Sequence, residues 1–332
     1  MNKSNVFMTI GCCMLLGGVA WGLGDFLAGG KTDYEAGPNA VATPAVPTKP
    51  ASTTDQPESS PADKGAPPRS AIPDNDFGDL VRKGEQIFNN PKQYASAYVG
   101  NDLSCNSCHF DAGRYEKTAP LRAAWPMYPA YRSKNGHVND FAERLQGCFI
   151  YSMNGKAPPR GGEVLRALES YSFWLAQGTR AGVKLDSKGF PEIAPPEQAP
   201  SFERGKEVFA DSCALCHGAD GAGQAANDGS DGFPPLWGAR SYNWGAGMHK
   251  VETAASFIKV AMPLSKPVLS DQQAWDVALF INSHERPQDP RFNGSVSETA
   301  EQFHQHDYAQ YGKEDAHGKV LGASSPPSGT VP

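Results

Sequence analysis

Two stretches of this sequence share one pattern, Cys105-Asn106-Ser107-Cys108-His109 and Cys213-Ala214-Leu215-Cys216-His217. C-x-x-C-H is the attachment signature of c-type haem. In such a site the two thiols bond covalently to the haem, and the histidine supplies one axial nitrogen to the iron. The pattern therefore predicts two covalently bound haem c groups, with His109 and His217 as iron ligands.

Zinc binding and thiol redox chemistry account less well for the paired cysteines. A structural zinc site built from two C-x-x-C pairs needs no histidine after each pair. A thioredoxin-like redox pair has the same cysteine spacing, but it would not occur twice with a histidine following each time. We therefore interpret Cys105, Cys108, Cys213 and Cys216 as the haem attachment residues.

The sequence around the two motifs also repeats. A glycine and a phenylalanine one helical turn apart precede each motif. These pairs are Gly84 with Phe88 and Gly205 with Phe209. Each copy ends in a predicted helix, over residues 163–177 and 271–284, and Ser270 is placed to cap the second. The repeat predicts an all-α fold with two cytochrome c-type haem domains in tandem.

Composition separates ordered from loose segments in the 332 residues. Stretches rich in Pro, Ala, Ser and Thr have too few large apolar side chains to offset the entropy of ordering. The predicted division is a signal peptide or membrane anchor (1–30), a disordered linker (31–74), haem domain 1 (75–188), an interdomain linker (189–200), haem domain 2 (201–290) and a C-terminal extension that becomes a disordered tail from about residue 318 (291–332). We expect His304 and His306, in that extension, to be surface residues.

The charge balance and the N-terminal residues bear on partners and compartment. The chain has 30 Lys and Arg against 36 Asp and Glu, and this lack of a basic excess argues against a nucleic-acid partner. Lys3 precedes an apolar stretch, Val6 to Leu23, that is typical of a cleaved export signal or a single retained anchor. We expect a periplasmic protein, soluble or tethered to the inner membrane by this segment alone.

Each haem iron needs a second axial ligand. In the second domain Met262 lies just before the last predicted helix, where small cytochrome c domains supply this ligand, and Met248 is the competitor. In the first domain Met153 has the corresponding position. Cys148 lies close by, however, and it is an unpaired cysteine in a chain expected to be exported. Spacing favours Met262 in the second domain and leaves Met153 and Cys148 even in the first.

Three stretches resemble the thiosulfate dehydrogenase family of di-haem c-type cytochromes. They are Leu145-Gln-Gly-Cys148-Phe-Ile-Tyr-Ser152-Met-Asn-Gly155-Lys156, then Phe233-Pro-Pro-Leu-Trp237-Gly with the later Gly245-Ala-Gly-Met248, and Phe280-Ile-Asn-Ser-His284-Glu-Arg-Pro-Gln-Asp-Pro290-Arg-Phe. The likeness covers roughly residues 79–322. It implies that Cys148 is the distal ligand of a catalytic haem 1, and that a His/Met haem 2 passes electrons out.

The resemblance also implies a reaction, the oxidation of two thiosulfate ions to tetrathionate, and the same site could run in reverse. Arg144 and Ser152, four residues before and after the cysteine, correspond to residues that hold the substrate. Lys156 and Arg160 are further candidates, because two dianions in one pocket require nearby cations. A soluble cytochrome or a membrane oxidase would accept the electrons.

The chain departs from the family in two places. The family often has arginine just before the substrate-holding serine, where this chain has Tyr151. Many members place a lysine or another coordinating residue beside the haem 2 methionine. This chain has Ala261 there, and Lys259 is three residues from Met262. The first difference concerns anion binding at haem 1, and the second concerns lysine ligation of haem 2.

Three other functions would also be compatible with two haem motifs. A di-haem cytochrome that only transfers electrons would have no need for Cys148 or its basic neighbours. A cytochrome that attaches thiosulfate to a carrier-protein cysteine would need that partner protein. A di-haem peroxidase would need an open haem position. We therefore expect an oxidoreductase that acts on sulfur compounds.

Overall fold

The computed structural model describes residues 65–224 and 232–329. The expected signal or anchor (1–30) and most of the expected linker lie outside these ranges. No helix within them is long and apolar enough to cross a membrane. By its internal contacts the chain divides into residues 1–56 and 57–332, and all the described residues belong to the second unit.

Short and medium helices make up most of the described chain, which fits the all-α prediction. The α-helices are α1 (Asp76–Asn89), α2 (Pro91–Tyr94), α3 (Phe110–Gly113), α4 (Leu121–Ala124), α5 (Phe141–Gly147), α6 (Glu163–Leu175), α7 (Phe202–Ser212), α8 (Ala214–His217), α9 (Val251–Ala261), α10 (Asp271–Asn282) and α11 (Val296–Phe303). Short 3-10 turns are η2 (Arg69–Ala71), η3 (Ser96–Tyr98), η4 (Cys105–Ser107), η5 (Trp125–Met127) and η7 (Gly247–His249). A single π-helical turn, η6, covers Cys148–Ser152.

One small antiparallel sheet was not expected from the sequence. Strand β1 (Ala130–Arg132) pairs with β2 (His137–Asn139), with Tyr131 opposite Val138. Both of these side chains are exposed. The hairpin therefore lacks the buried face that makes alternation visible in a sequence.

Helices α7 and α10 begin where the sequence supplies a capping side chain. Ser270 accepts a hydrogen bond from the Gln273 backbone N–H, and the Gln273 side chain accepts one from the Ser270 N–H, which confirms the predicted cap of α10. Ser201 caps α7 by accepting from the Arg204 N–H. The two predicted C-terminal helices are present as α6 and α10, each ending two residues before its expected end.

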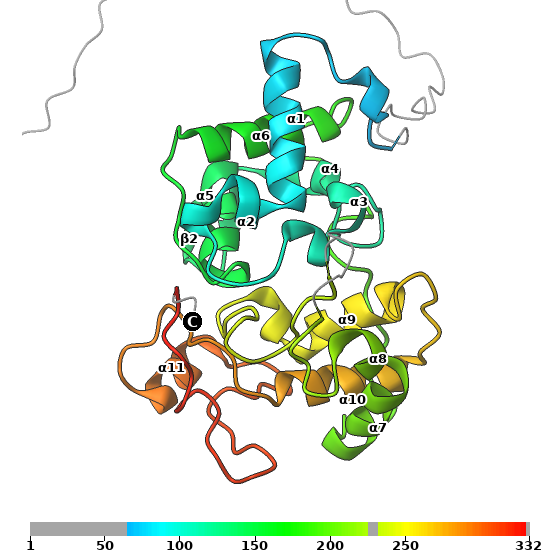
Figure 1. The fold of residues 1–332 in the computed structure, drawn as a ribbon, viewed down its shortest axis with the longest axis vertical. Coiled ribbons are helices and arrows are strands. Elements are labelled where there is room, and N and C mark those ends of the chain that lie inside the picture. Colours follow the sequence, from blue (N-terminus) through cyan, green and yellow to red (C-terminus); the bar gives the residue numbers. More distant parts are fainter. Residues whose placement is uncertain (1–64, 225–231, 330–332) are drawn as a thin grey trace, which may run out of the picture. The chain divides into compact units, whose positions relative to one another are not determined.

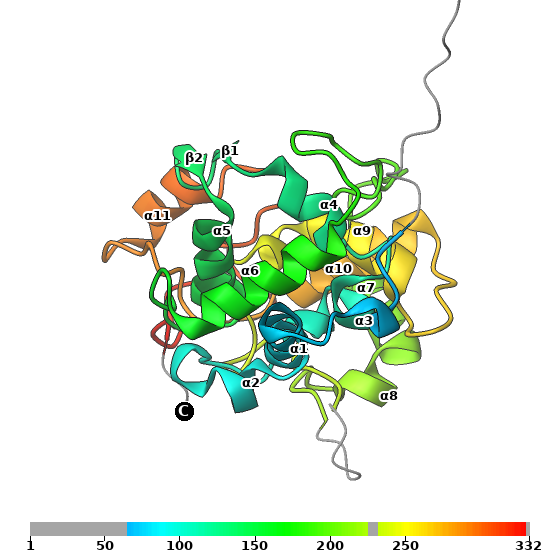
Figure 2. The same ribbon diagram turned by 90° about the horizontal axis from the view of Figure 1, so that it is seen from above.

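The repeated glycines mark two helix crossings of the same kind. Helix α1 packs on α6, and α7 packs on α10; each pair lies side by side in both Figure 1 and Figure 2. A Cβ atom on Gly84 would lie 2.2 Å from the Ala167 carbonyl oxygen, and one on Gly205 would lie 2.1 Å from that of Asp276. One turn later, Phe88 and Phe209 are buried. Only glycine permits such close approach of the two backbones.

Each crossing belongs to its own hydrophobic core. The first core gathers residues from Val81 to Leu175, together with Tyr242 and Ala246. The second gathers residues from Phe209 to Ile281. Tyr242 and Ala246 follow the second motif in sequence but pack in the first core. The two halves of the described chain are therefore interlocked.

The interdomain linker (189–200) packs against the second core rather than standing free of it. Phe190 and Ile193 both contact that core. The Phe190 ring lies 5.4 Å from the Phe257 ring, and the Trp275 indole N–H donates to the Ala194 carbonyl. The proline content of residues 189–200 predicts a segment without stable packing. In the structure these contacts hold the segment against the second core.

The end of the chain also differs from its prediction. A disordered tail is expected from about residue 318, yet Leu321 is buried against Trp244 and Tyr311 in a third small core. The Gly322 N–H donates to the Glu285 carboxylate, and the Gln288 N–H donates to the Pro326 carbonyl. The adjacent pair Val320 and Leu321 among Gly, Ser and Pro gives no periodic signal, so the sequence pattern does not reveal this packing.

We predict that Gly84→Ala and Gly205→Ala each lower the free energy of unfolding by about 1–3 kcal/mol, because the added methyl overlaps a backbone carbonyl of the facing helix. Denaturant unfolding of the haem-loaded protein measures this. The matched controls Gln86→Ala and Lys206→Ala change exposed positions on the same two helices and should stay within about 0.5 kcal/mol. If Gly84→Ala left the free energy of unfolding unchanged, the close contact between α1 and α6 would be contradicted.

Candidate functional site

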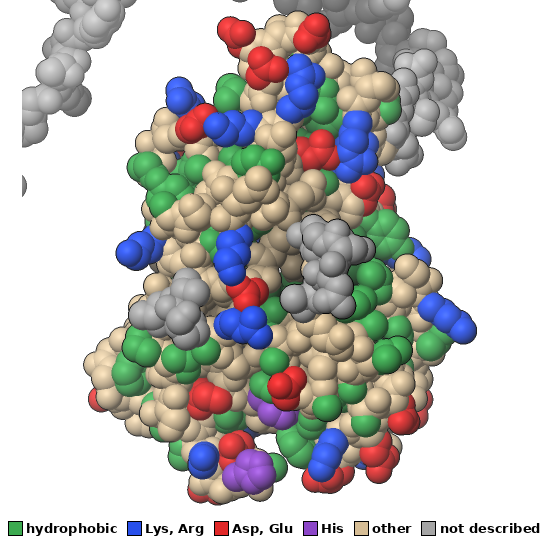
Figure 3. Space-filling model, in the orientation of Figure 1, with side chains coloured by type: hydrophobic (Ala, Val, Ile, Leu, Met, Phe, Trp, Pro, Cys, Tyr) green, Lys and Arg blue, Asp and Glu red, His purple; other side chains and the backbone are tan. Residues whose placement is uncertain are grey.

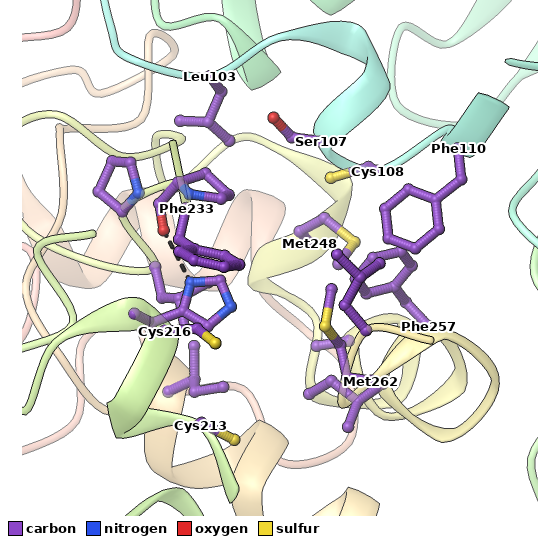
Figure 4. A pocket seen from close by; sticks show the side chains of 18 of the residues that line it. Leu103, Ser107, Cys108, Phe110, Cys213, Cys216, Phe233, Met248, Phe257 and Met262 are labelled. Carbon is purple, nitrogen blue, oxygen red and sulfur yellow. Dashed lines mark hydrogen bonds between the residues drawn. The ribbon is translucent and has the colours of Figure 1, made fainter. Parts of the chain in front are cut away.

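The second C-x-x-C-H motif borders a cavity of about 440 Å³. Cys213, Cys216 and His217 come from the end of α7 and from α8, and most of the other lining side chains are apolar. Met248 and Met262 lie on the side opposite Cys213 and Cys216 (Figure 4). Both methionines that the sequence offers as ligands therefore reach this cavity.

His217 is held in one orientation by the backbone. Its Nδ1 lies 2.9 Å from the Pro234 carbonyl oxygen, which can only accept, so Nδ1 carries the proton. Burial lowers the pKa of His217, which keeps the ring neutral and leaves Nε2 free to bind a metal. An apolar cavity of this size with two thiols and one neutral imidazole fits a covalently attached haem.

The first motif repeats this arrangement. The Nδ1 of His109 lies 2.9 Å from the Ala119 carbonyl oxygen, and burial lowers the pKa of His109. Burial raises the pKa of Cys108 to about 12, so the unattached thiol is neutral. Cys108 also lines the cavity of the second motif, above the methionines in Figure 4. The two motifs are therefore neighbours in space.

Cys148 lies beside the first motif. It opens the π-helical turn that follows α5, and such turns are frequent at functional sites. Burial raises the pKa of Cys105, and the nearby Cys148 raises it further. Arg144, one turn earlier on α5, donates a 2.9 Å hydrogen bond from Nη1 to the Cys148 sulfur. Its proximity to Cys148 and its contact with Tyr128 raise the pKa of Arg144.

Two asparagines bind the carbonyls of this turn. The Asn243 side chain donates to the Ile150 carbonyl (2.9 Å), and the Asn243 backbone N–H faces the Tyr151 carbonyl (3.4 Å). The Asn101 side chain donates to the Ser152 carbonyl (2.8 Å). Asn101 and Asn243 are almost completely buried. Three successive carbonyls that the π-turn leaves open are thus satisfied from outside the helix.

The other sequence-predicted site residues lie in different surroundings. Ser152 ends the π-turn and is half-buried, but Lys156 is exposed. Arg160 forms an ion pair with Asp140, the N-cap of α5, and is also exposed. Arg144, Cys148 and Ser152 are therefore on one continuous helical segment, whereas the structure does not bring Lys156 and Arg160 to the sulfur.

Met153 and Lys259 have packing partners of their own. The Met153 side chain is 2% exposed and belongs to the first core. The Lys259 ammonium donates to the Leu269 carbonyl (2.8 Å) and pairs with Asp271 (2.7 Å). Lys259 is thus bound at the start of α10 in this structure.

Two cations that sequence reasoning missed lie near the Tyr151 ring. The Lys134 ammonium lies 4.4 Å from the centre of the Tyr151 ring, and the Arg291 guanidinium lies 5.5 Å from it. Lys134 comes from the β1–β2 hairpin and donates to the Gly245 carbonyl. Lys134 is exposed as a whole residue, but desolvation together with Arg291 and Arg144 lowers the pKa of Lys134 to about 7. Lys134 and Arg291 reach the π-turn only through tertiary contacts. The spacing of residues along the sequence therefore does not predict that they lie there.

Acidic and basic side chains are interspersed on the face shown in Figure 3, over the part of it that the described residues form. This mixture agrees with the absence of a basic excess in the composition. Any attraction of anions to the site must therefore come from nearby cations rather than from the charge of the whole molecule.

Comparison with known proteins gives consistent matches. The family model described as Cytochrome c matches residues 202–285. Thiosulfate dehydrogenase from Thiomonas intermedia is 52% identical over 77% of this chain and 81% of the relative. Thiosulfate dehydrogenase from Stutzerimonas stutzeri is 48% identical over 77% of this chain and 84% of the relative.

A solved structure is similar as well. Thiosulfate dehydrogenase (TsdBA) from Marichromatium purpuratum, in its as-isolated form, gives a TM-score of 0.75 at 49% identity, covering 78% of this chain. This chain spans little more than half, 57%, of that longer chain. Taken with the site described above, these matches show that the chain belongs to the thiosulfate dehydrogenase family and is an oxidoreductase that carries covalent haem c and acts on sulfur compounds.

Proposed function

We propose that this protein oxidises two thiosulfate ions to tetrathionate at the π-turn that begins with Cys148, according to 2 S₂O₃²⁻ → S₄O₆²⁻ + 2 e⁻. The observation that carries this proposal is the 2.9 Å hydrogen bond from Arg144 to the Cys148 sulfur beside the first C-x-x-C-H motif. A cytochrome that only transfers electrons would not need a cation and a thiol paired at that place.

Two haem c groups are part of the proposal. Cys105, Cys108 and His109 would hold haem 1, with Cys148 as its second ligand. The second haem would be held by Cys213, Cys216, His217 and Met262. When bound, the haems would each accept one electron, passing them from haem 1 to haem 2. Cys108 borders the cavity of the second motif, which supports a short path between the two sites.

The protein's own cations would compensate the charge of the substrate. Two thiosulfate ions bring four negative charges, which repel strongly at short distance in a partly desolvated site. Arg144 lies beside the sulfur, and its guanidinium can hold an anion through charge-assisted hydrogen bonds. Lys134 and Arg291, which both lie near the Tyr151 ring, would replace the charge of the arginine that the family often has at that position. Ser152 would donate a further hydrogen bond.

Product formation and electron exit complete the proposal. Formation of the central S–S bond of tetrathionate releases two electrons and no proton, so no general base is required. The electrons would leave for an external acceptor, a soluble cytochrome or a membrane oxidase, in the periplasm. Turnover of thiosulfate alone with ferricyanide as acceptor tests the function, because a cytochrome that attaches thiosulfate to a carrier protein would be inactive without its carrier.

We predict that Cys148, and not Met153, ligates haem 1. Cys148→Ser should remove the low-spin thiolate signal of one haem and most of the activity, while both haems stay covalently attached. Met153→Leu should leave the spectrum unchanged, because it replaces a core residue with one of similar volume. Electron paramagnetic resonance of the oxidised protein distinguishes the two. Two His/Met signals in the wild type would refute the assignment.

We predict that Arg144→Ala lowers kcat/KM for thiosulfate by roughly 10- to 100-fold, since a charge-assisted hydrogen bond of about 1.5–3 kcal/mol is lost. Arg160→Ala should cost far less, because the Arg160 guanidinium is paired with Asp140. Arg166→Ala, on the exposed face of α6, is the surface control and should have no effect. Equal losses in Arg144→Ala and Arg160→Ala would be evidence against this site.

We predict that KM for thiosulfate rises roughly three- to fivefold as the pH increases from 6 to 8, the size expected of one partly screened charge. Lys134, with a pKa of about 7, is mostly protonated at pH 6 and mostly neutral at pH 8. Its attraction for the thiosulfate dianion is therefore lost as the pH rises, and KM increases. The groups that face it are the cations Arg144, Arg291 and Lys250, the carboxylate of Asp289, and His249 and His304, whose pKa values are lowered.

Two variants isolate this effect. Lys134→Met should show the high KM at both pH values, and Lys134→Arg should keep the low KM, because arginine stays charged throughout this range. Lys184→Met changes an exposed lysine elsewhere and should keep the wild-type profile. A pH profile unchanged in Lys134→Met would assign the titration to another group.

A further inference from the structure

Three histidines from distant parts of the sequence meet at one point. His249 ends the η7 turn, and His304 and His306 follow α11. His249 is 1% exposed and His304 is 3% exposed, so the expectation that His304 is a surface residue is wrong; His306 is half-buried. One nitrogen of each ring lies within 4.8 Å of those of the other two.

The outer nitrogen of each ring faces a group that can only accept a hydrogen bond. His249 Nδ1 bonds to the Ala246 carbonyl, and His306 Nδ1 lies 3.2 Å from the Asp307 carbonyl. His304 Nε2 lies 3.1 Å from the Asp289 carboxylate, whose pKa is lowered so that it is ionised. Each outer nitrogen must therefore carry the ring proton. In a neutral ring the inner nitrogen then has only a lone pair.

These inner nitrogens face one another at short range. His249 Nε2 lies 3.0 Å from His306 Nε2 and 3.1 Å from His304 Nδ1. Burial lowers the pKa of all three histidines, which favours the neutral rings. Three lone pairs then point at a common centre with no proton between them. Such a group of buried acceptors is stabilised by a cation.

We propose that His249, His304 and His306 bind one first-row divalent metal ion, of which Zn²⁺ is the probe. Tetrahedral Zn–N bonds of about 2.0–2.1 Å place ligand nitrogens about 3.3 Å apart, close to two of the three separations here. A modest shift of the half-buried His306 brings the third into range. Solvent reaches the site beside His306 and can supply a fourth ligand as water.

The surroundings are those that a metal site needs. A carboxylate and two backbone carbonyls accept from the outer nitrogens, which fixes the tautomers and orients the lone pairs inward. Imidazole suits Zn²⁺, Cu²⁺ and Ni²⁺, whereas Ca²⁺ and Mg²⁺ prefer oxygen ligands, and the three ligands here are nitrogens. The ionised Asp289 offsets part of the metal charge and also pairs with Arg291.

A metal here would link two separate segments. His249 directly follows Met248, which contacts both hydrophobic cores. His304 and His306 belong to the C-terminal extension. The ion would fasten the extension to the segment that follows the second haem motif, and it would stabilise the folded state by an amount that increases with its affinity. The alternative is a metal-free cluster in which one ring is protonated and donates to the others.

The experiment uses the protein with its haems attached, treated with a chelator and then titrated with Zn²⁺ against a competing chelator. We expect one zinc per chain, measured by elemental analysis after gel filtration, with a Kd below about 1 μM. Zinc should raise the Tm of the wild type. His306→Gln and His249→Gln should each weaken zinc binding by at least about 100-fold and abolish the Tm shift.

His317→Gln is the matched control, because His317 is an exposed histidine in the same extension. It should bind zinc as the wild type does. His306→Gln alters a half-buried ring, and an unchanged haem spectrum confirms that this variant is folded. No zinc retained by the wild type, or equal retention in wild type and His306→Gln, would overturn the proposal. Because zinc content and Tm are read without thiosulfate, this result is independent of the proposed oxidation.

Discussion

Hydrogen bonds to three successive carbonyls, those of Ile150, Tyr151 and Ser152, join the two halves of the described chain at the π-turn. A π-turn does not satisfy these groups within itself, and leaving a buried carbonyl without a partner costs about 1–3 kcal/mol. Asn101 supplies one donor from before the first motif, and Asn243 supplies two from beyond the second. The position of the Cys148 sulfur therefore depends on both halves at once.

The two haem-motif regions are built alike and differ where the second ligand is expected. In both, a glycine lets the first helix cross the last, and the motif histidine donates to a backbone carbonyl. In the second region α9 leads to Met262, in an apolar cavity. In the first, α5 leads instead to Cys148, with Arg144 beside it. A shared scaffold with one altered segment accounts for two sites of different chemistry.

Features with a local signature could be predicted from the sequence. The haem motifs, the glycine–phenylalanine pairs, the Ser270 cap and the Arg144–Cys148 pair all lie within a few turns of chain, where spacing determines which side chains meet. The features that were missed depend on contacts between distant segments. Lys134 reaches Tyr151 from a hairpin, Leu321 is buried by Trp244, and His304 meets a ring 55 positions away. Periodicity in the sequence does not predict such long-range contacts, because they depend on how the two folded halves of the described chain pack together.

The N–H of Gly329 donates a hydrogen bond to the side chain of Asn154, 175 positions earlier in the sequence. Asn154 is the second residue after the π-turn. Asn154 in turn accepts from Asn243. The surroundings of Asn154 are thus completed only when the segment that contains Gly329 has packed against it. Loss of the contact at Gly329 would consequently be felt next to the turn that begins with Cys148, although the two lie far apart in the sequence.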